Sequence, residues 1–146
     1  MMQQVKIKGN GKNNVLSVDL SGVLCLIENG SQYRWAIFYL EAVVNPNTIN
    51  VLEFENQIYN SKYGYPISFD DLAAFSKIIF QTIEIVLIGE ADEHRKMIRY
   101  ELDDFNSYYT HTFCLELVDS SYWEVRSTDE AFIKRIRDTF EGVTDL

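Results

Sequence analysis

The chain has 146 residues, of which 13 are Lys or Arg and 22 are Asp or Glu, so its formal net charge at pH 7 is −9. This length suits a single domain, 1–146, whose core is large enough to hold the fold without a metal or disulfides. The acidic balance argues against binding to nucleic acid or to an anionic membrane surface, because both need clustered Lys and Arg. A net negative charge is compatible with a basic protein partner.

Strand patterns separated by turn signals dominate the first part of the chain. Apolar and polar residues alternate over 4–8, and further apolar runs cover 15–20, 23–28 and 33–44. The Asn-Gly dipeptide at 29–30 is typical of a tight turn. Because short connections place antiparallel strands side by side, the sequence predicts a meander in this part of the chain.

Helical patterns occur in three places. The spacing of apolar residues weakly favours a helix over 49–59. A clearer helix is expected to begin after Ser68, whose hydroxyl can cap the first turn. Ser127 and Glu130 have the spacing of a capping box, so a last helix is expected from there to about Glu141.

The second half returns to strand patterns. Strands are predicted at 83–89, 97–102, 110–119 and 122–126, again with short connections. The sum predicts an α+β fold, with an antiparallel β-sheet of about seven to eight strands and two to three helices packed on it.

The residue types that usually carry catalysis or metal binding are few and scattered. Cys25 and Cys114 lie in apolar runs and are predicted to be buried thiols. His111 has apolar neighbours and is predicted to be a hydrogen-bonded core or sheet-edge histidine, while His94 lies in a charged turn and is expected to be solvated. No spacing suits a zinc site or an activated nucleophile, so the sequence predicts no catalytic, cofactor-binding or metal-binding residue and no enzymatic activity.

Neither a signal-peptide pattern nor an apolar stretch long enough to span a bilayer is evident, so the expected location is the cytoplasm.

Two segments combine acidic and aromatic residues, 101–109 and 119–124. Aromatic side chains supply contact area in protein interfaces, and carboxylates attract a basic partner. The predicted partner-binding residues are Glu101, Asp103, Asp104, Tyr108, Tyr109, Tyr122, Trp123 and Glu124.

The stretch 119–125, followed by 127–130 and an amphipathic terminal helix, resembles the C-terminal end of several small bacterial immunity proteins of polymorphic-toxin and contact-dependent growth inhibition systems. The resemblance implies a protein that binds one cognate toxin domain, often a nuclease, and blocks its active surface. Such a toxin would be basic where it meets phosphates, which an acidic partner complements.

Two other functions fit the sequence. One is a small-ligand-binding or enzymatic α+β domain, with a pocket between helices and sheet lined by Trp35, Tyr39 and His111. The other is a structural subunit whose exposed aromatic residues form a homodimer face, so the sequence leaves open whether the protein is a monomer or a homodimer.

Overall fold

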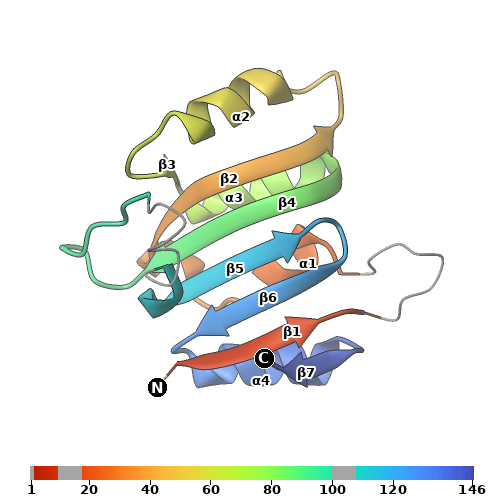
Figure 1. Ribbon diagram of the computed structural model, residues 1–146, viewed down its shortest axis with the longest axis vertical. Coiled ribbons are helices and arrows are strands. Elements are labelled where there is room, and N and C mark those ends of the chain that lie inside the picture. Colours follow the sequence, from red (N-terminus) through yellow and green to blue (C-terminus); the bar gives the residue numbers. More distant parts are fainter. Residues whose placement is uncertain (1, 10–17, 100–107) are drawn as a thin grey trace.

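An antiparallel sheet organises the computed structural model, which describes residues 2–9, 18–99 and 108–146 (Figure 1). Within those residues seven strands form the sheet and helices pack on it, so the predicted α+β class is confirmed. The elements are β1 (Gln3–Ile7), α1 (Leu20–Leu24), the 3₁₀ helix η2 (Gly30–Gln32), β2 (Arg34–Val44), α2 (Val51–Tyr59), β3 (Tyr65–Ile67), α3 (Phe69–Ile78), β4 (Ile79–Glu90), β5 (Phe113–Val118), β6 (Tyr122–Ser127), α4 (Glu130–Thr139) and β7 (Val143–Asp145).

The strand order is β3-β2-β4-β5-β6-β1-β7, and every neighbouring pair is antiparallel. Strand β1 therefore lies between β6 and β7, next to the C-terminal end of the chain (Figure 1). Its buried residues Val5 and Ile7 pair with Val125 and Trp123 of β6. The predicted meander of the first part of the chain is wrong, because β1 completes its apolar face on a distant strand.

The predicted strands at 15–20 and 23–28 are also wrong where the structure describes them, since residues 20–24 form helix α1. The buried residues of this helix are Leu20, Val23 and Leu24, a spacing of three and four residues that suits one helical face. Asp19 caps the helix, because its carboxylate accepts a hydrogen bond of 2.8 Å from the backbone N–H of Gly22. Residues 15–17 lie outside the described part of the chain.

The later elements differ from the prediction mainly at their ends. Strand β4 begins at Ile79, directly after α3, and β5 begins at Phe113 rather than at 110. Residues 97–99 of the predicted strand 97–102 have no regular structure, and 100–102 lie outside the described residues. The two short edge strands β3 and β7 were not predicted.

The cap of helix α4 is Asp129, whose carboxylate accepts from the N–H of Phe132 at 3.1 Å. Ser127, which the sequence suggested as the cap, instead accepts from the N–H of Asp129 at 3.0 Å.

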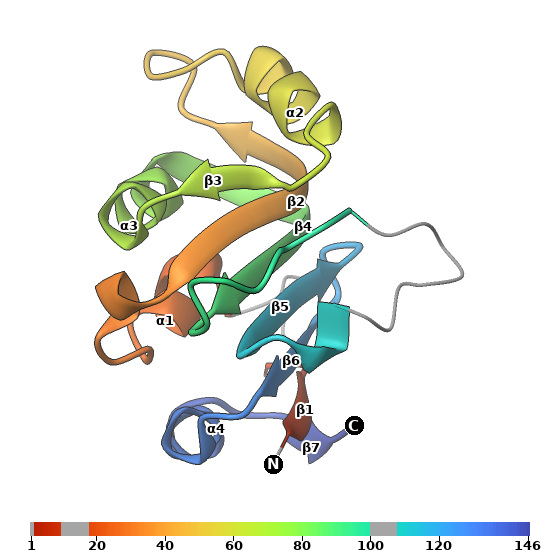
Figure 2. The ribbon, with the colours of Figure 1, turned by 90° about the vertical axis from the view of Figure 1, so that its left-hand side faces the viewer.

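The two faces of the sheet are covered differently. Helices α1, α3 and α4 lie on one face, which we call the helix face, and the main core forms there (Figure 2). Trp35 and Trp123 are buried in this core, and their indole N–H groups donate to the carbonyls of Gly30 and Val18, each at 2.8 Å. The opposite face, which we call the open face, has a smaller apolar cluster under the segment that follows β4, formed by Ala36, Phe38, Ile88, Met97, Tyr108 and Cys114.

Candidate functional site

The register of the sheet places charged and aromatic side chains on the open face, the same face that has the smaller apolar cluster. Two pairs of glutamates lie directly opposite each other on neighbouring strands: Glu41 of β2 with Glu84 of β4, and Glu116 of β5 with Glu124 of β6. Like charges in directly opposed positions destabilise a sheet unless a cation lies between them.

One pair has such a cation, and we call Glu116 and Glu124 the neutralised pair. The guanidinium of Arg126 lies 3.9 Å from a carboxylate oxygen of Glu116 and 3.4 Å from one of Glu124. The same guanidinium lies over the ring of Tyr109, 3.6 Å from its centroid, and its Nε donates to Gln4 at 2.9 Å. Stacking and ion pairing thus hold one arginine on this half of the open face.

The other pair, Glu41 and Glu84, has no Lys, Arg or His within 4.0 Å among the described residues, and we call it the uncompensated pair. Tyr39 lies beside it with 36% of its surface exposed, and Tyr59 of α2 is 68% exposed. Partial burial, followed by the charges of Glu84 and Glu41, raises the pKa of the Tyr39 phenol. The negative field of this pair therefore acts on a partly exposed aromatic side chain.

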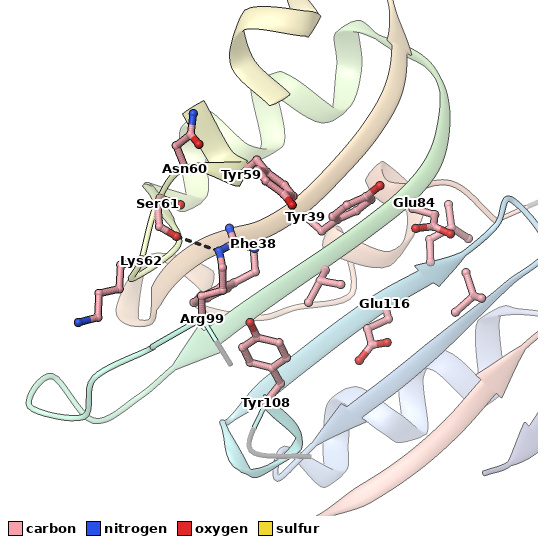
Figure 3. Close-up of a pocket in the computed structure, with 13 residues that line it drawn as sticks. Phe38, Tyr39, Tyr59, Asn60, Ser61, Lys62, Glu84, Arg99, Tyr108 and Glu116 are labelled. Carbon is pink, nitrogen blue, oxygen red and sulfur yellow. Dashed lines mark hydrogen bonds between the residues drawn. The ribbon is translucent and has the colours of Figure 1, made fainter. Parts of the chain in front are cut away.

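A groove of about 810 Å³ runs along the open face between the end of α2 and strands β2, β4 and β5 (Figure 3). Phe38, Tyr39, Tyr59 and Tyr108 supply its aromatic lining, and Glu84 and Glu116 supply its carboxylates; we call it the aromatic–acidic groove. The rings of Tyr39 and Tyr59 lie together in it, and Glu84 lies on the far side of Tyr39 (Figure 3).

Arg99 also lines the groove, but its donors are used within the chain. Its Nε donates to the carbonyl of Ser61 at 3.0 Å, and its Nη2 donates to that of Ile58 at 2.6 Å. Ile58 lies in the last turn of α2 and Ser61 directly follows its cap, Asn60, and a positive charge is favourable at the C-terminal end of a helix. Arg99 therefore fixes the end of α2 beside β2, at the opposite end of the groove from Glu84 (Figure 3).

Glu116 is the buried member of the neutralised pair. Burial raises the pKa of its carboxyl, although the charge of Arg126 acts in the opposite direction. The thiol of Cys114 donates to this carboxylate at 3.5 Å, and burial raises the pKa of the thiol well above its usual value. Cys114 is buried as predicted, whereas Cys25 is exposed and that prediction is wrong, because Cys25 ends helix α1 instead of lying in a strand.

Of the predicted partner-binding residues, Tyr109, Tyr122 and Glu124 lie on or beside the open face and are partly exposed. Trp123 is 0% exposed and lies in the core of the helix face, whereas Tyr108 is 3% exposed and lines the aromatic–acidic groove. Glu101, Asp103 and Asp104 lie outside the described residues.

The uncompensated pair was not predicted from the sequence, and Tyr39 was predicted only as a lining residue of a pocket between helices and sheet. Glu41 and Glu84 are single charges within long apolar strands, and only the register of β2 with β4 brings them together. A charged residue inside an otherwise apolar strand was the available signal, but it does not reveal which residue lies opposite.

The pocket proposed between helices and sheet does not form from the residues named for it. Trp35 faces the helix side, Tyr39 lines the groove on the open face, and His111 is fully buried. These three side chains therefore do not line a common cavity.

His111 belongs to a buried polar cluster at the end of β4. Its Nδ1 lies 2.6 Å from Glu90 Oε1, to which Arg95 also donates at 3.1 Å. Burial lowers the pKa of the imidazole; burial also acts to raise the pKa of Glu90, but hydrogen bonds from Asp92 and His111 outweigh it and lower that pKa. The predicted hydrogen-bonded buried histidine is confirmed, and the imidazole is closed to solvent.

His94 is exposed, as expected. No group of three or more His, Cys, Asp or Glu side chains with the geometry of a metal site occurs in the part of the chain that the structure describes. Within the same residues, no helix is long and apolar enough to cross a membrane. Comparison with protein-family models, with curated proteins and with solved structures gave no significant match.

Proposed function

We propose that this protein binds a basic protein toxin and neutralises it, as bacterial immunity proteins do, with the open face of the sheet as the docking surface. The observation that carries the proposal is the uncompensated pair, Glu41 and Glu84, beside the exposed rings of Tyr39 and Tyr59. Two opposed carboxylates cost stability in the free protein, and a basic partner removes that cost on binding.

The chemistry of this surface favours a protein partner. Tyrosines contribute large contact areas with little loss of side-chain entropy, and they are enriched at the centres of interfaces. Carboxylates accelerate association with a basic surface and select against acidic competitors. Tyr122 and Glu124, which lie in the stretch that resembles immunity proteins, extend the same face towards β6.

The test uses the product of the adjacent gene as the candidate toxin, purified as an inactive variant, with affinity measured by calorimetry at low and moderate salt. We expect a nanomolar Kd that weakens as salt increases. The double variant E41K/E84K should weaken binding by about hundredfold, because it places positive charge against a basic partner.

The matched control is D138K/E141K, which changes the net charge by the same amount. Asp138 lies in the last turn of α4, which packs on the helix face (Figure 2), and Glu141 follows the cap of this helix; both residues are exposed. Its binding should remain within a few-fold of wild type. Equal losses in both variants would reduce the effect to net charge and reject the open face, and absence of binding to the adjacent gene product would reject the immunity function.

The small-ligand alternative retains one supporting observation, since a groove of about 810 Å³ falls within the size range of small-molecule sites. A small cationic metabolite that raises the Tm of the wild type, but not that of Y39A, would support this alternative over a toxin partner if the adjacent gene product does not bind.

A further inference from the structure

The open face already contains one bound guanidinium, that of Arg126. Three features hold it: a tyrosine ring at 3.6 Å, and the carboxylates of Glu116 and Glu124, which lie opposite each other on neighbouring strands. This arrangement shows which group the geometry of this face accepts, because a planar cation stacks on the ring while its edges reach the carboxylates.

The uncompensated pair has the same kinds of group, two opposed carboxylates and a tyrosine ring, but no cation between them. Glu41 and Glu84 are opposed across β2 and β4 as Glu116 and Glu124 are across β5 and β6. Tyr39 lies beside them as Tyr109 lies beside Arg126, and next to Tyr39 is the ring of Tyr59, whose centroid lies 5.9 Å from the guanidinium of Arg99. Among the described residues, no cation lies within ion-pairing distance of Glu41 or Glu84.

The aromatic–acidic groove gives space for such a cation to enter from outside. Tyr39, Tyr59 and Glu84 line it, and its volume of about 810 Å³ is much larger than one side chain. Arg99 lies at the other end of the groove, with its guanidinium 5.7 Å from the ring centroid of Phe38 and 5.9 Å from that of Tyr59. Among the described residues no cation lies over the ring of Tyr39 or pairs with Glu84, so this part of the groove is where an external cation can bind.

We infer that the groove binds a guanidinium group, which an arginine of the partner protein supplies, stacked on Tyr39 and ion-paired with Glu84. This inference rests on the proposed function for the source of the arginine, but not for the binding of the guanidinium itself. Arginine is favoured over lysine because a planar guanidinium stacks on a ring and forms two parallel hydrogen bonds with a carboxylate, whereas an ammonium is more strongly hydrated and does neither.

The first test needs no partner. The probes are N-acetyl-arginine N-methylamide and the corresponding lysine derivative, added to the protein while the tyrosine ring resonances are followed by NMR. The arginine probe should shift the resonances of Tyr39 and Tyr59 and saturate at millimolar concentration, and the lysine probe should bind several-fold more weakly. Equal binding of both probes, or no shift of these two tyrosines, would overturn the inference.

Glu84→Gln should weaken binding of the arginine probe by about tenfold, because one charged hydrogen-bond acceptor is lost. The matched control is Glu141→Gln, the same substitution at an exposed carboxylate that follows α4 and lies outside the groove, and it should leave binding unchanged. Equal loss in both variants would show that the probe senses only the overall charge of the protein and would overturn the site.

The second test uses the complex with the adjacent gene product. Each arginine of that protein is changed to lysine and combined with E84Q in a double-mutant cycle. One arginine should show coupling with Glu84, so that its replacement costs at least about tenfold in wild type and much less in E84Q. Tight binding without any coupled arginine would overturn the inference and leave the proposed function intact.

The arginine probe could also bind while the adjacent gene product does not. This result would support the guanidinium site and reject the toxin-binding function. Light scattering adds a last outcome. We expect a monomer; a dimer that dissociates in E84Q would assign the groove to an arginine of a second copy and overturn the assignment to a partner protein.

Discussion

The two glutamate pairs of the open face have the same backbone arrangement and opposite electrostatic outcomes. Glu116 and Glu124 share the guanidinium of Arg126, which follows Glu124 by two residues and therefore projects from the same face of β6. Two residues on either side of Glu41 the chain has Tyr39 and Val43, which carry no positive charge. The first pair is balanced within the fold, while the second leaves charge and aromatic surface for another molecule, and sites that break a local stability rule are where function is expected.

The largest effect is expected from removing the cation of the neutralised pair. Arg126→Met should lower the free energy of unfolding by about 3 kcal/mol, because Glu116 would then be buried without its partner. Urea denaturation at pH 7 measures the change. Adding Glu116→Gln to this variant should recover part of the loss, and a loss below about 1 kcal/mol in Arg126→Met would mean that this pair behaves like an exposed one.

The next prediction concerns Glu90, a carboxylate of the same strand as Glu84 that is ion-paired with Arg95 and hydrogen-bonded to His111. Burial lowers the pKa of His111, so the unfolded chain binds a proton at this position before the folded chain does. Stability is therefore complete above the ordinary histidine pKa of about 6.5 and falls as the pH decreases below it, by at most about 1.4 kcal/mol per pH unit.

The control for this prediction is His111→Asn, whose amide can donate to Glu90 but does not titrate. The difference in unfolding free energy between the wild type and this variant should change between pH 7 and pH 5, in the direction of a relatively less stable wild type at low pH. A constant difference would show that His111 does not contribute to the pH dependence.

A smaller effect, of opposite sign in the two pairs, is expected from neutralising one carboxylate in each. Glu84→Gln should raise the free energy of unfolding by about 0.5 kcal/mol, because it removes repulsion from Glu41. Glu124→Gln should lower it, because Arg126 loses a partner at 3.4 Å. Chemical denaturation of both variants under the same conditions tests the comparison, and stabilisation by both would mean that Arg126 does not balance its pair.

Local patterns in the sequence predicted the fold class and several element positions. Alternation identified β1, the long apolar run identified β2, and Ser68 was correctly placed as the cap of α3, where its hydroxyl accepts from the N–H of Asp71. Helix α1 was not predicted because it is only five residues long. A segment this short, with Val23 and Leu24 adjacent, fits a strand pattern as well as a helical one.

Long-range pairing could not be predicted in the same way. The alternation of β1 fits any strand with an apolar face, and nothing local shows that its neighbours are β6 and β7. The same limit applies to the candidate site: segments rich in acids and aromatic residues were visible along the chain, whereas Glu41 and Glu84 become a pair only through the register of two strands. Trp123 illustrates the converse, since its acidic and polar neighbours in sequence concealed its place in the core.

The smallest predicted effect is a change in the pKa of Tyr39, which reports the electrostatic field of Glu84 at this ring. Burial comes first among the causes that raise the pKa of Tyr39, and Glu84 comes second, so Glu84→Gln should lower this pKa while leaving it above the usual value for tyrosine. Absorbance titration of the wild type and of each variant, with the corresponding Tyr39→Phe protein subtracted, gives the contribution of this phenol. Glu124→Gln should leave the pKa of Tyr39 unchanged. An unchanged pKa in Glu84→Gln would mean that solvent screens this carboxylate from the ring beside it, and a guanidinium stacked on that ring would then gain little from Glu84.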